Sequence, residues 1–106
     1  LGHSIEQYYH YTGISHGRAV AKGMEIITDL AEKRGMCRKG LTADLCGCLK
    51  KYELTRDIEP TPAQLGSACM NDKKRDGSSI HVIICSDIGK SSAVKMSVAD
   101  FNDFLA

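Results

Sequence analysis

The chain has 106 residues, of which 42% are hydrophobic and 25% are charged, and its formal net charge is +1. This composition is typical of one small globular domain and excludes disordered and collagen-like chains. Basic residues are scattered between acidic ones and form no stripe, so we expect no nucleic-acid partner. No apolar run is long enough to cross a bilayer, so we expect no membrane partner either.

The five cysteines are an odd number without a recurrent spacing, which argues against a disulfide framework and for a reducing, cytoplasmic setting. Cys46 and Cys48 stand two residues apart on a predicted helix, so they point to different faces and do not favour a joint metal site. We interpret the cysteines as free thiols that pack as small buried hydrophobic side chains.

Two helices are predicted in the first third of the chain. The first covers about residues 3–11 and ends in an aromatic patch. The second begins near Ser15 or His16 and is stopped by Gly35. Its apolar residues recur at helical spacing and are Ala19, Val20, Met24, Ile27, Leu30 and Ala31.

Two glycines, Gly17 and Gly23, fall inside this second helix. Each costs about 1 kcal/mol relative to alanine at a helical position. We therefore expect a backbone segment or a ligand to approach the helix closely at these two positions.

Two further helices have N-terminal signals in the sequence. One is expected to open at Thr42, with the Thr42 hydroxyl as its cap. Its core-facing residues are expected to be Leu45, Cys48, Leu49 and Tyr52. The other opens in Thr61-Pro62-Ala63-Gln64, which has a hydroxyl at the cap, proline at the first helical position and Gln three residues on, and it is predicted to reach about Asn71.

A β-hairpin and a last helix are predicted at the C-terminal end. Residues 80–85 are a β-branched run typical of a buried strand, and residues 92–96 predict a returning strand. Ser97 is expected to cap a terminal helix whose apolar residues are Val98, Phe101, Phe104 and Leu105. The sequence therefore predicts a mainly α fold, a small helical domain with a short β-hairpin near the C-terminus.

Histidines are the first candidates for chemistry. We interpret His81, in a predicted strand, and His10, among tyrosines, as structural residues. His16 stands at a helix start beside Gly17, where its side chain can project into a cleft. A single histidine at a helix start is a weak signal by itself.

An ordered set of motifs gives a stronger signal. Gly2-His3-Ser4-Ile5-Glu6 is followed by H-G-R-A-V-A-K-G-M at residues 16–24, then by Asp72-Lys73-Lys74, the predicted strand and Ile88-Gly89-Lys90. In this order the chain resembles the 3-dehydroquinate synthases, a family of sugar-phosphate cyclases, over essentially its whole length. The most specific element is the pairing of G-H-x-I-E with H-G-x-A-V-x-x-G-M. The resemblance implies that residues 1–106 form the C-terminal helical domain of such an enzyme.

The resemblance also implies roles for four residues. His3 matches a histidine of the substrate site that assists the chemistry, and His16 matches a histidine that binds zinc. Lys73 and Lys74 match an Asp-Lys-Lys stretch in which a lysine reaches the anionic substrate, and which of the two does so stays open. The family's other zinc ligands, a histidine and a glutamate, are implied to lie before Leu1, where we expect further residues because the chain begins without Met inside a helical pattern.

The implied reaction converts 3-deoxy-arabino-heptulosonate 7-phosphate to 3-dehydroquinate and phosphate, in the shikimate pathway to the aromatic amino acids. It uses NAD and zinc or another divalent metal. NAD requires a nucleotide-binding domain, whose glycine-rich turn this sequence lacks, so we expect that domain to precede the chain. Alone, the chain is expected to bind neither cofactor tightly and to be inactive.

Three alternatives stay open. Arg18 stands where the family usually has an acid after His-Gly, which leaves room for a related sugar-phosphate cyclase with another substrate. The incomplete site is also compatible with a non-catalytic helical interaction module derived from this scaffold. A small metal-binding domain that combines cysteines with His16 ranks last, because the cysteine spacing is poor. The sequence does not decide the oligomeric state, so a homodimer also stays open.

Overall fold

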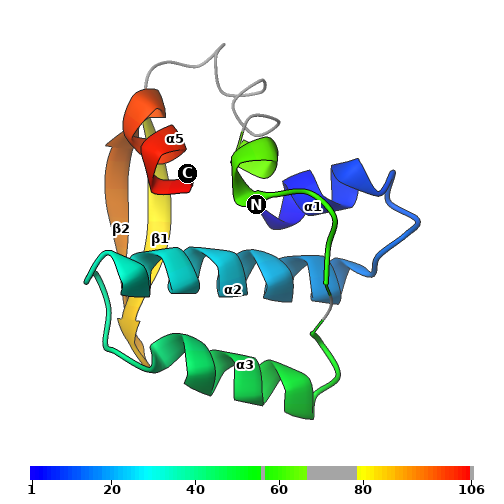
Figure 1. Ribbon diagram of the computed structural model, residues 1–106, viewed down its shortest axis with the longest axis horizontal. Helices are drawn as coiled ribbons and strands as arrows, with labels where there is room; N and C mark the ends of the chain where they lie inside the picture. Colours follow the sequence, from blue (N-terminus) through cyan, green and yellow to red (C-terminus); the bar gives the residue numbers. More distant parts are fainter. Residues whose placement is uncertain (56, 67–78, 106) are drawn as a thin grey trace.

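The computed structural model describes residues 1–55, 57–66 and 79–105 (Figure 1). Its elements are α1 (Gly2–Tyr8), α2 (His16–Lys33), α3 (Leu41–Lys51), a helical segment at residues 62–66, β1 (Ser79–Asp87), β2 (Lys90–Ser97) and α5 (Val98–Leu105). The predicted mainly α fold with a hairpin near the C-terminus is therefore confirmed. None of the helices in the described ranges is both long enough and apolar enough to cross a membrane.

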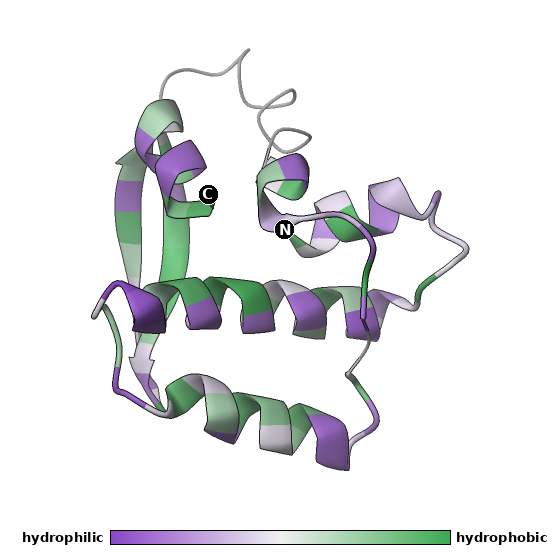
Figure 2. Cartoon of the chain, viewed as in Figure 1, coloured by the Kyte–Doolittle hydropathy of each residue, from purple (hydrophilic) through white to green (hydrophobic). Residues whose placement is uncertain are grey.

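The helix α2 is the centre of the fold. It runs between α1 and the segment 62–66 on one side and α3 on the other, and the hairpin stands at its C-terminal end (Figure 1). Its N-terminal half packs against a cluster of Ile5, Ile14, Ala19 and Leu65. Its C-terminal half packs against a second cluster of Ala31, Val82, Ile84, Met96, Phe101, Phe104 and Leu105. In Figure 2 the hydrophobic colour recurs along β1 and α2, and hydrophilic residues occupy the last turns of α2 and α3.

The helices α1 and α2 cross at backbone contact distance. A Cβ atom added to Gly23 would lie 3.0 Å from the backbone nitrogen of Gly2, and one added to Gly2 would lie 3.2 Å from the Cα of Val20. Ile5 and Ala19 are completely buried beside this crossing. The expected close approach at Gly23 is therefore confirmed, whereas at Gly17 the nearest atom to an added Cβ is a side-chain carbon at the ordinary distance of 3.8 Å.

Two predicted N-terminal caps, at Thr61 and Ser97, are confirmed, and the structure adds a third at Ser15, within the predicted start of the second helix. The Ser15 hydroxyl accepts a hydrogen bond from the backbone N–H three residues later, so α2 starts at His16. Thr61 and Gln64 form a reciprocal capping box, with distances of 2.9 and 3.2 Å between each side-chain oxygen and the other residue's backbone nitrogen. The Ser97 hydroxyl accepts from the third N–H of α5 at 3.1 Å. The predicted extension of the capping-box helix to Asn71 lies outside the described residues.

The predicted cap at Thr42 is wrong. The helix α3 starts one residue earlier, at Leu41, after Gly40 in the left-handed conformation with φ of 90°. The Thr42 N–H instead donates to Oε1 of Glu32 on α2 at 2.9 Å. The Thr42 hydroxyl is buried and has no hydrogen-bond partner among the described residues. A contact between two helices has thus replaced the expected local cap.

The first helix is shorter than predicted. It ends at Tyr8 instead of residue 11, because His10 and Tyr11 adopt left-handed conformations with φ of 54° and 62°. These two residues turn the chain toward α2, and both are exposed. His10 is therefore not buried, and His81 is likewise exposed, on the outer face of the hairpin; that neither takes part in the chemistry stays a prediction.

Several predicted core residues are exposed. Val20 is 41% exposed, Met24 48% and Tyr52 65%, and Cys48 is exposed as well. In contrast, Ala19 and Ala31 of α2, Leu49 of α3, and Phe101, Phe104 and Leu105 of α5 are buried as expected. Helical spacing identifies an apolar stripe, but the buried positions of α2 are mostly small residues such as Ala19, Gly23 and Ala31, whereas Ile27 and Leu30 are half-buried against the hairpin cluster.

The described cysteines are free thiols, as expected, and Cys69 lies outside the described residues. Their predicted burial is only partly correct, because Cys37 and Cys46 are half-buried whereas Cys48 and Cys85 are exposed. Burial raises the pKa of both the Cys37 and the Cys46 thiols. Neither thiol is therefore activated toward nucleophilic chemistry.

The hairpin is longer than predicted. Its two strands pair antiparallel from Ser79 opposite Ser97 to Asp87 opposite Lys90, with an irregularity just before the turn. Gly89 has a φ of 77°, which the tight turn requires and which glycine adopts at no steric cost. One face of the hairpin, which carries Val82 and Ile84, packs against core residues of α5 and α2.

Replacing Gly23 with alanine should destabilise the chain, because the new methyl group would meet the backbone of α1. Overpacking of this kind costs about 1–3 kcal/mol, part of which the better helix propensity of alanine offsets. Gly47, in α3, is a matched control, because a Cβ added there has no neighbour within 4 Å. Urea unfolding should show a lower midpoint for G23A and a raised one for G47A. Equal stabilisation by both substitutions would contradict the close crossing.

Candidate functional site: a histidine–glutamate pair at the crossing of two helices

Glu6 of α1 and His16 of α2 are the centre of the candidate site. Nδ1 of His16 and Oε1 of Glu6 are 2.9 Å apart. The His16 side chain is 78% exposed, whereas that of Glu6 is only 16% exposed. The carboxylate is thus fixed between the helices, and the imidazole stands on the surface above it.

Two features of the fold position the His16 side chain beside Glu6. The Ser15 cap makes His16 the first residue of α2, where the start of the helix faces the loop that follows α1. The close α1–α2 crossing then brings Glu6 within hydrogen-bond distance of the ring. The position of His16 at a helix start, which the sequence predicted, therefore places its ring beside the carboxylate of Glu6.

His3 lies on α1 one helical turn before Glu6, so the two residues share a face of that helix. Its ring is exposed, and the centroid is 6.0 Å from that of Tyr11 in the loop that connects α1 to α2. His3, Glu6 and His16 therefore belong to one region of the surface. The other two predicted site residues, Lys73 and Lys74, lie outside the described residues.

An apolar stripe continues this region along α2. Val20 and Met24 follow His16 at intervals of four residues, which places all three on one face of the helix. Both apolar side chains are large and about half exposed. Single exposed apolar residues are ordinary, but two in line with an exposed histidine mark a face suited to contact with another surface.

Arg18 is held away from this stripe. Its Nε–H donates to the backbone oxygen of Glu53, just after α3, at 3.2 Å. Glu53 has a left-handed conformation with φ of 58°, which turns its carbonyl group toward α2. Arg18, which departs from the family pattern, therefore links α2 to the segment after α3.

The donor set fits a metal ion only in part. Within the described ranges, no group of three or more His, Cys, Asp or Glu residues could hold a metal. In metal-binding histidines one ring nitrogen commonly bonds a carboxylate while the other binds the metal, and Nδ1 of His16 makes such a carboxylate contact with Glu6. His16 therefore fits one ligand position of a metal site, whose remaining ligands would come from elsewhere.

A groove between α2, the start of α3 and residues 58–62 has a volume of about 390 Å³. Its walls carry Lys22 and Glu25, which form an ion pair at 3.5 Å, together with Asp29, Ile58 and Pro60. The groove contains neither His3 nor His16. Each of these charged groups already has an ion-pair partner, because Asp29 pairs with Lys33, so the groove presents no free set of convergent charges for a ligand.

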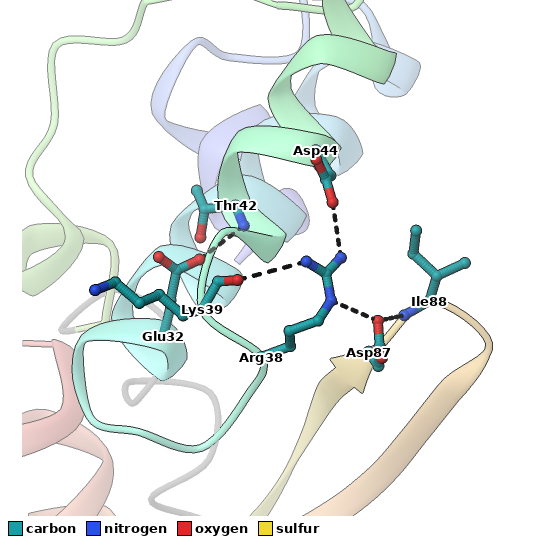
Figure 3. Close-up of polar contacts among 7 residues, drawn as sticks. All are labelled: Glu32, Arg38, Lys39, Thr42, Asp44, Asp87 and Ile88. Carbon is teal, nitrogen blue, oxygen red and sulfur yellow. Dashed lines mark hydrogen bonds and ion pairs between the residues drawn. The ribbon is translucent and has the colours of Figure 1, made fainter.

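A second polar cluster, at the other end of α2, is structural (Figure 3). The guanidinium of Arg38 donates to Asp44 of α3 at 2.7 Å and to Asp87 of β1 at 2.8 Å. The Arg38 backbone N–H also donates to the oxygen of Ser86 at 2.8 Å. Arg38 therefore ties the start of α3 to the end of β1. The hydrogen bonds from Arg38 and from the Ile88 N–H lower the pKa of Asp87 below its usual value.

Comparison with known families decides where this chain belongs. The sequence pattern that defines the family "3-dehydroquinate synthase C-terminal" matches residues 1–75, which include His3, Glu6 and His16. The chain belongs to this family. The resemblance inferred from the motifs is thereby confirmed.

Individual relatives agree with the family assignment. A 3-dehydroquinate synthase of Clostridium perfringens (strain SM101 / Type A) is 37% identical over 95% of this chain, which spans 29% of that protein. One of Streptococcus thermophilus (strain ATCC BAA-491 / LMD-9) is 34% identical over 99% of this chain, which spans 30% of it. The chain thus covers less than a third of the length of these relatives.

The fold is also that of solved sugar-phosphate cyclases. A crystal structure of 2-deoxy-scyllo-inosose synthase with carbaglucose-6-phosphate, NAD+ and Co2+ superposes with a TM-score of 0.73, at 22% identity over 98% of this chain and 32% of that one. A second structure of 2-deoxy-scyllo-inosose synthase gives a TM-score of 0.71, at 20% identity over 96% of this chain and 30% of that one. At this identity the likeness shows the fold alone.

Glu6 is the residue to which the sequence analysis gave no role. It was visible only as the last letter of G-H-x-I-E, and its hydrogen bond to His16 depends on how two helices cross. One signal could have found it, because a histidine and a carboxylate spaced by one helical turn, here His3 and Glu6, share a helix face.

The Asp87–Arg38 pair predicts how acid affects stability. The pKa of Asp87 is lower in the folded chain than in the unfolded one, so its contribution is fully present above the unfolded value of 3.8 and is lost as the pH falls below it. We expect D87N to lower the urea midpoint at neutral pH and to flatten its dependence on pH between about 5 and 2. R38Q is the matched variant; because Arg38 also bonds Asp44, R38Q should cost more than D87N, and the double substitution should cost little more than R38Q alone. An unchanged pH dependence in D87N would contradict this role.

Proposed function

We propose that this chain is the C-terminal portion of a 3-dehydroquinate synthase, the enzyme that converts 3-deoxy-arabino-heptulosonate 7-phosphate to 3-dehydroquinate and phosphate. The observation that carries the proposal is the pairing of Glu6 with an exposed His16, one turn from His3, inside the part of the chain that matches the family. The named relatives, at 34% to 37% identity, support the same reaction.

The proposed roles follow from the chemistry of each side chain. His16 offers one imidazole nitrogen to zinc or another divalent metal, which when bound polarises a substrate hydroxyl group. His3, an exposed imidazole, accepts or donates the proton that the reaction moves. Lys73 or Lys74 supplies an ammonium group to the anionic substrate.

The rest of the site is proposed to come from an N-terminal NAD-binding domain of the same enzyme. The relatives are more than three times as long as this chain, and the 2-deoxy-scyllo-inosose synthase was crystallised with NAD+ and Co2+. We propose that residues 1–106 form one domain and that His16, Val20 and Met24 face the missing one. A single ligand cannot close a metal site, so the chain alone should bind zinc weakly and be inactive.

A related cyclase is the second candidate. Arg18 reverses the charge usual beside the family's histidine, and the structural neighbours named above act as 2-deoxy-scyllo-inosose synthases. Such an enzyme would accept a hexose 6-phosphate, the compound that carbaglucose-6-phosphate resembles. Dehydroquinate synthase remains the preferred assignment, because Arg18 is bound to the Glu53 backbone and leaves His3 and His16 exposed.

The test uses the complete enzyme that carries this chain, assayed with 3-deoxy-arabino-heptulosonate 7-phosphate and, separately, with glucose 6-phosphate. H3A should lower kcat by about 10²–10⁴-fold while the bound metal is retained, because His3 moves a proton without holding the metal. H16A should lose bound metal, as measured by elemental analysis. H81A is the matched control, because His81 is an exposed histidine on the hairpin, and it should leave kcat and metal content unchanged.

Each alternative predicts a different outcome of this assay. Turnover of glucose 6-phosphate alone would favour the related cyclase. A polypeptide that lacks a nucleotide-binding region and turns over neither sugar would favour the non-catalytic interaction module. If H3A and H81A had equal effects on kcat, His3 would not be a catalytic residue.

A further inference from the structure

We propose that Glu6 is a positioning residue that fixes the tautomer of His16, so that Nδ1 carries the proton and Nε2 faces outward as the ligand atom. This inference rests on the proposed metal-binding role of His16. It adds a residue that acts through His16 and names the ring nitrogen that binds. The observation behind it is the 2.9 Å contact between Oε1 of Glu6 and Nδ1 of His16.

A carboxylate group imposes this tautomer by its chemistry. An ionised carboxylate only accepts hydrogen bonds, so the neutral imidazole can bond to it only through an Nδ1–H group. The Nε2 lone pair is then free, on a side chain that is 78% exposed. An amide or a hydroxyl group at the same place could either donate or accept, and it would not select one tautomer.

The two side chains differ in mobility in the way that positioning requires. Glu6 follows Ile5, which is completely buried at the helix crossing, and the Glu6 side chain is itself 16% exposed. The His16 side chain is 78% exposed, so few contacts other than the hydrogen bond restrict its rotation. The fixed partner therefore orients the mobile one.

An ordinary surface ion pair would not have this consequence. Exposed pairs contribute little to stability and need no particular tautomer, so loss of Glu6 would then leave the ring nitrogens unchanged. The distinction can be measured, because the two tautomers of a neutral imidazole give different nitrogen chemical shifts. The readout is independent of enzyme activity.

The experiment uses the 106-residue chain with nitrogen-labelled histidine, studied by NMR at about pH 8.5, two units above the ordinary imidazole pKa. We expect the Nδ1–H form of His16 to predominate, and E6M to shift the tautomer ratio by about tenfold toward Nε2–H. Methionine fills a similar volume and offers no strong acceptor. E6Q, which keeps a hydrogen-bonding group and so protects the fold, should give an intermediate ratio. His81 is the internal reference, and its signals should not move.

Zinc chloride, added in millimolar excess, separates this inference from the proposed function. Selective displacement of the Nε2 signal of His16 would support both. A predominant Nδ1–H form with no response to zinc at either nitrogen would overturn the metal-binding role and leave the tautomer assignment intact. A predominant Nε2–H form in the unsubstituted chain, zinc bound at Nδ1, or an E6M ratio equal to that of the unsubstituted chain would overturn the positioning role of Glu6.

Discussion

The backbone contact between α1 and α2 is the constraint on which the rest of the structure depends. With glycine at positions 2 and 23, the two helices approach until a single methyl group would meet backbone atoms. At this separation Ile5 and Ala19 are completely buried, and the Glu6 carboxylate reaches the His16 ring. Wider separation would expose the core of the N-terminal half and break the hydrogen bond that orients the candidate ligand. Folding and the candidate chemistry thus depend on the same crossing.

The fold could be predicted from the sequence where its signals are local. Ser97 and the Thr61-Pro62-Ala63-Gln64 stretch cap helices by bonds to N–H groups within three residues, and both predicted caps were confirmed. Thr42 has the same local signal, but its N–H bonds to Glu32 of another helix. Local rules cannot show such a contact. The exposure of residues predicted to be core has a similar reason, because helical periodicity shows where an apolar stripe lies and not which surface covers it.

The candidate site could be predicted less completely. His3 and His16 were found because they stand in motifs of a known family, whereas the chemistry of either residue alone is ambiguous. Glu6 acquires a role only when α1 lies against α2, and the lysines at positions 73 and 74 stay predictions. The exposed stripe at Val20 and Met24 also gained meaning only from the structure, because it continues the histidine face along α2. Under the proposed function, these residues form one wall of a site that a second domain completes.

Anomalous diffraction at the zinc edge, from crystals of the complete enzyme that carries this chain, tests this account most directly. The account predicts one zinc ion at about 2.0–2.1 Å from Nε2 of His16, with Nδ1 still hydrogen-bonded to Glu6 and the remaining ligands supplied from outside residues 1–106. A zinc ion bound through cysteines, or bound elsewhere with His16 free of metal, would contradict it.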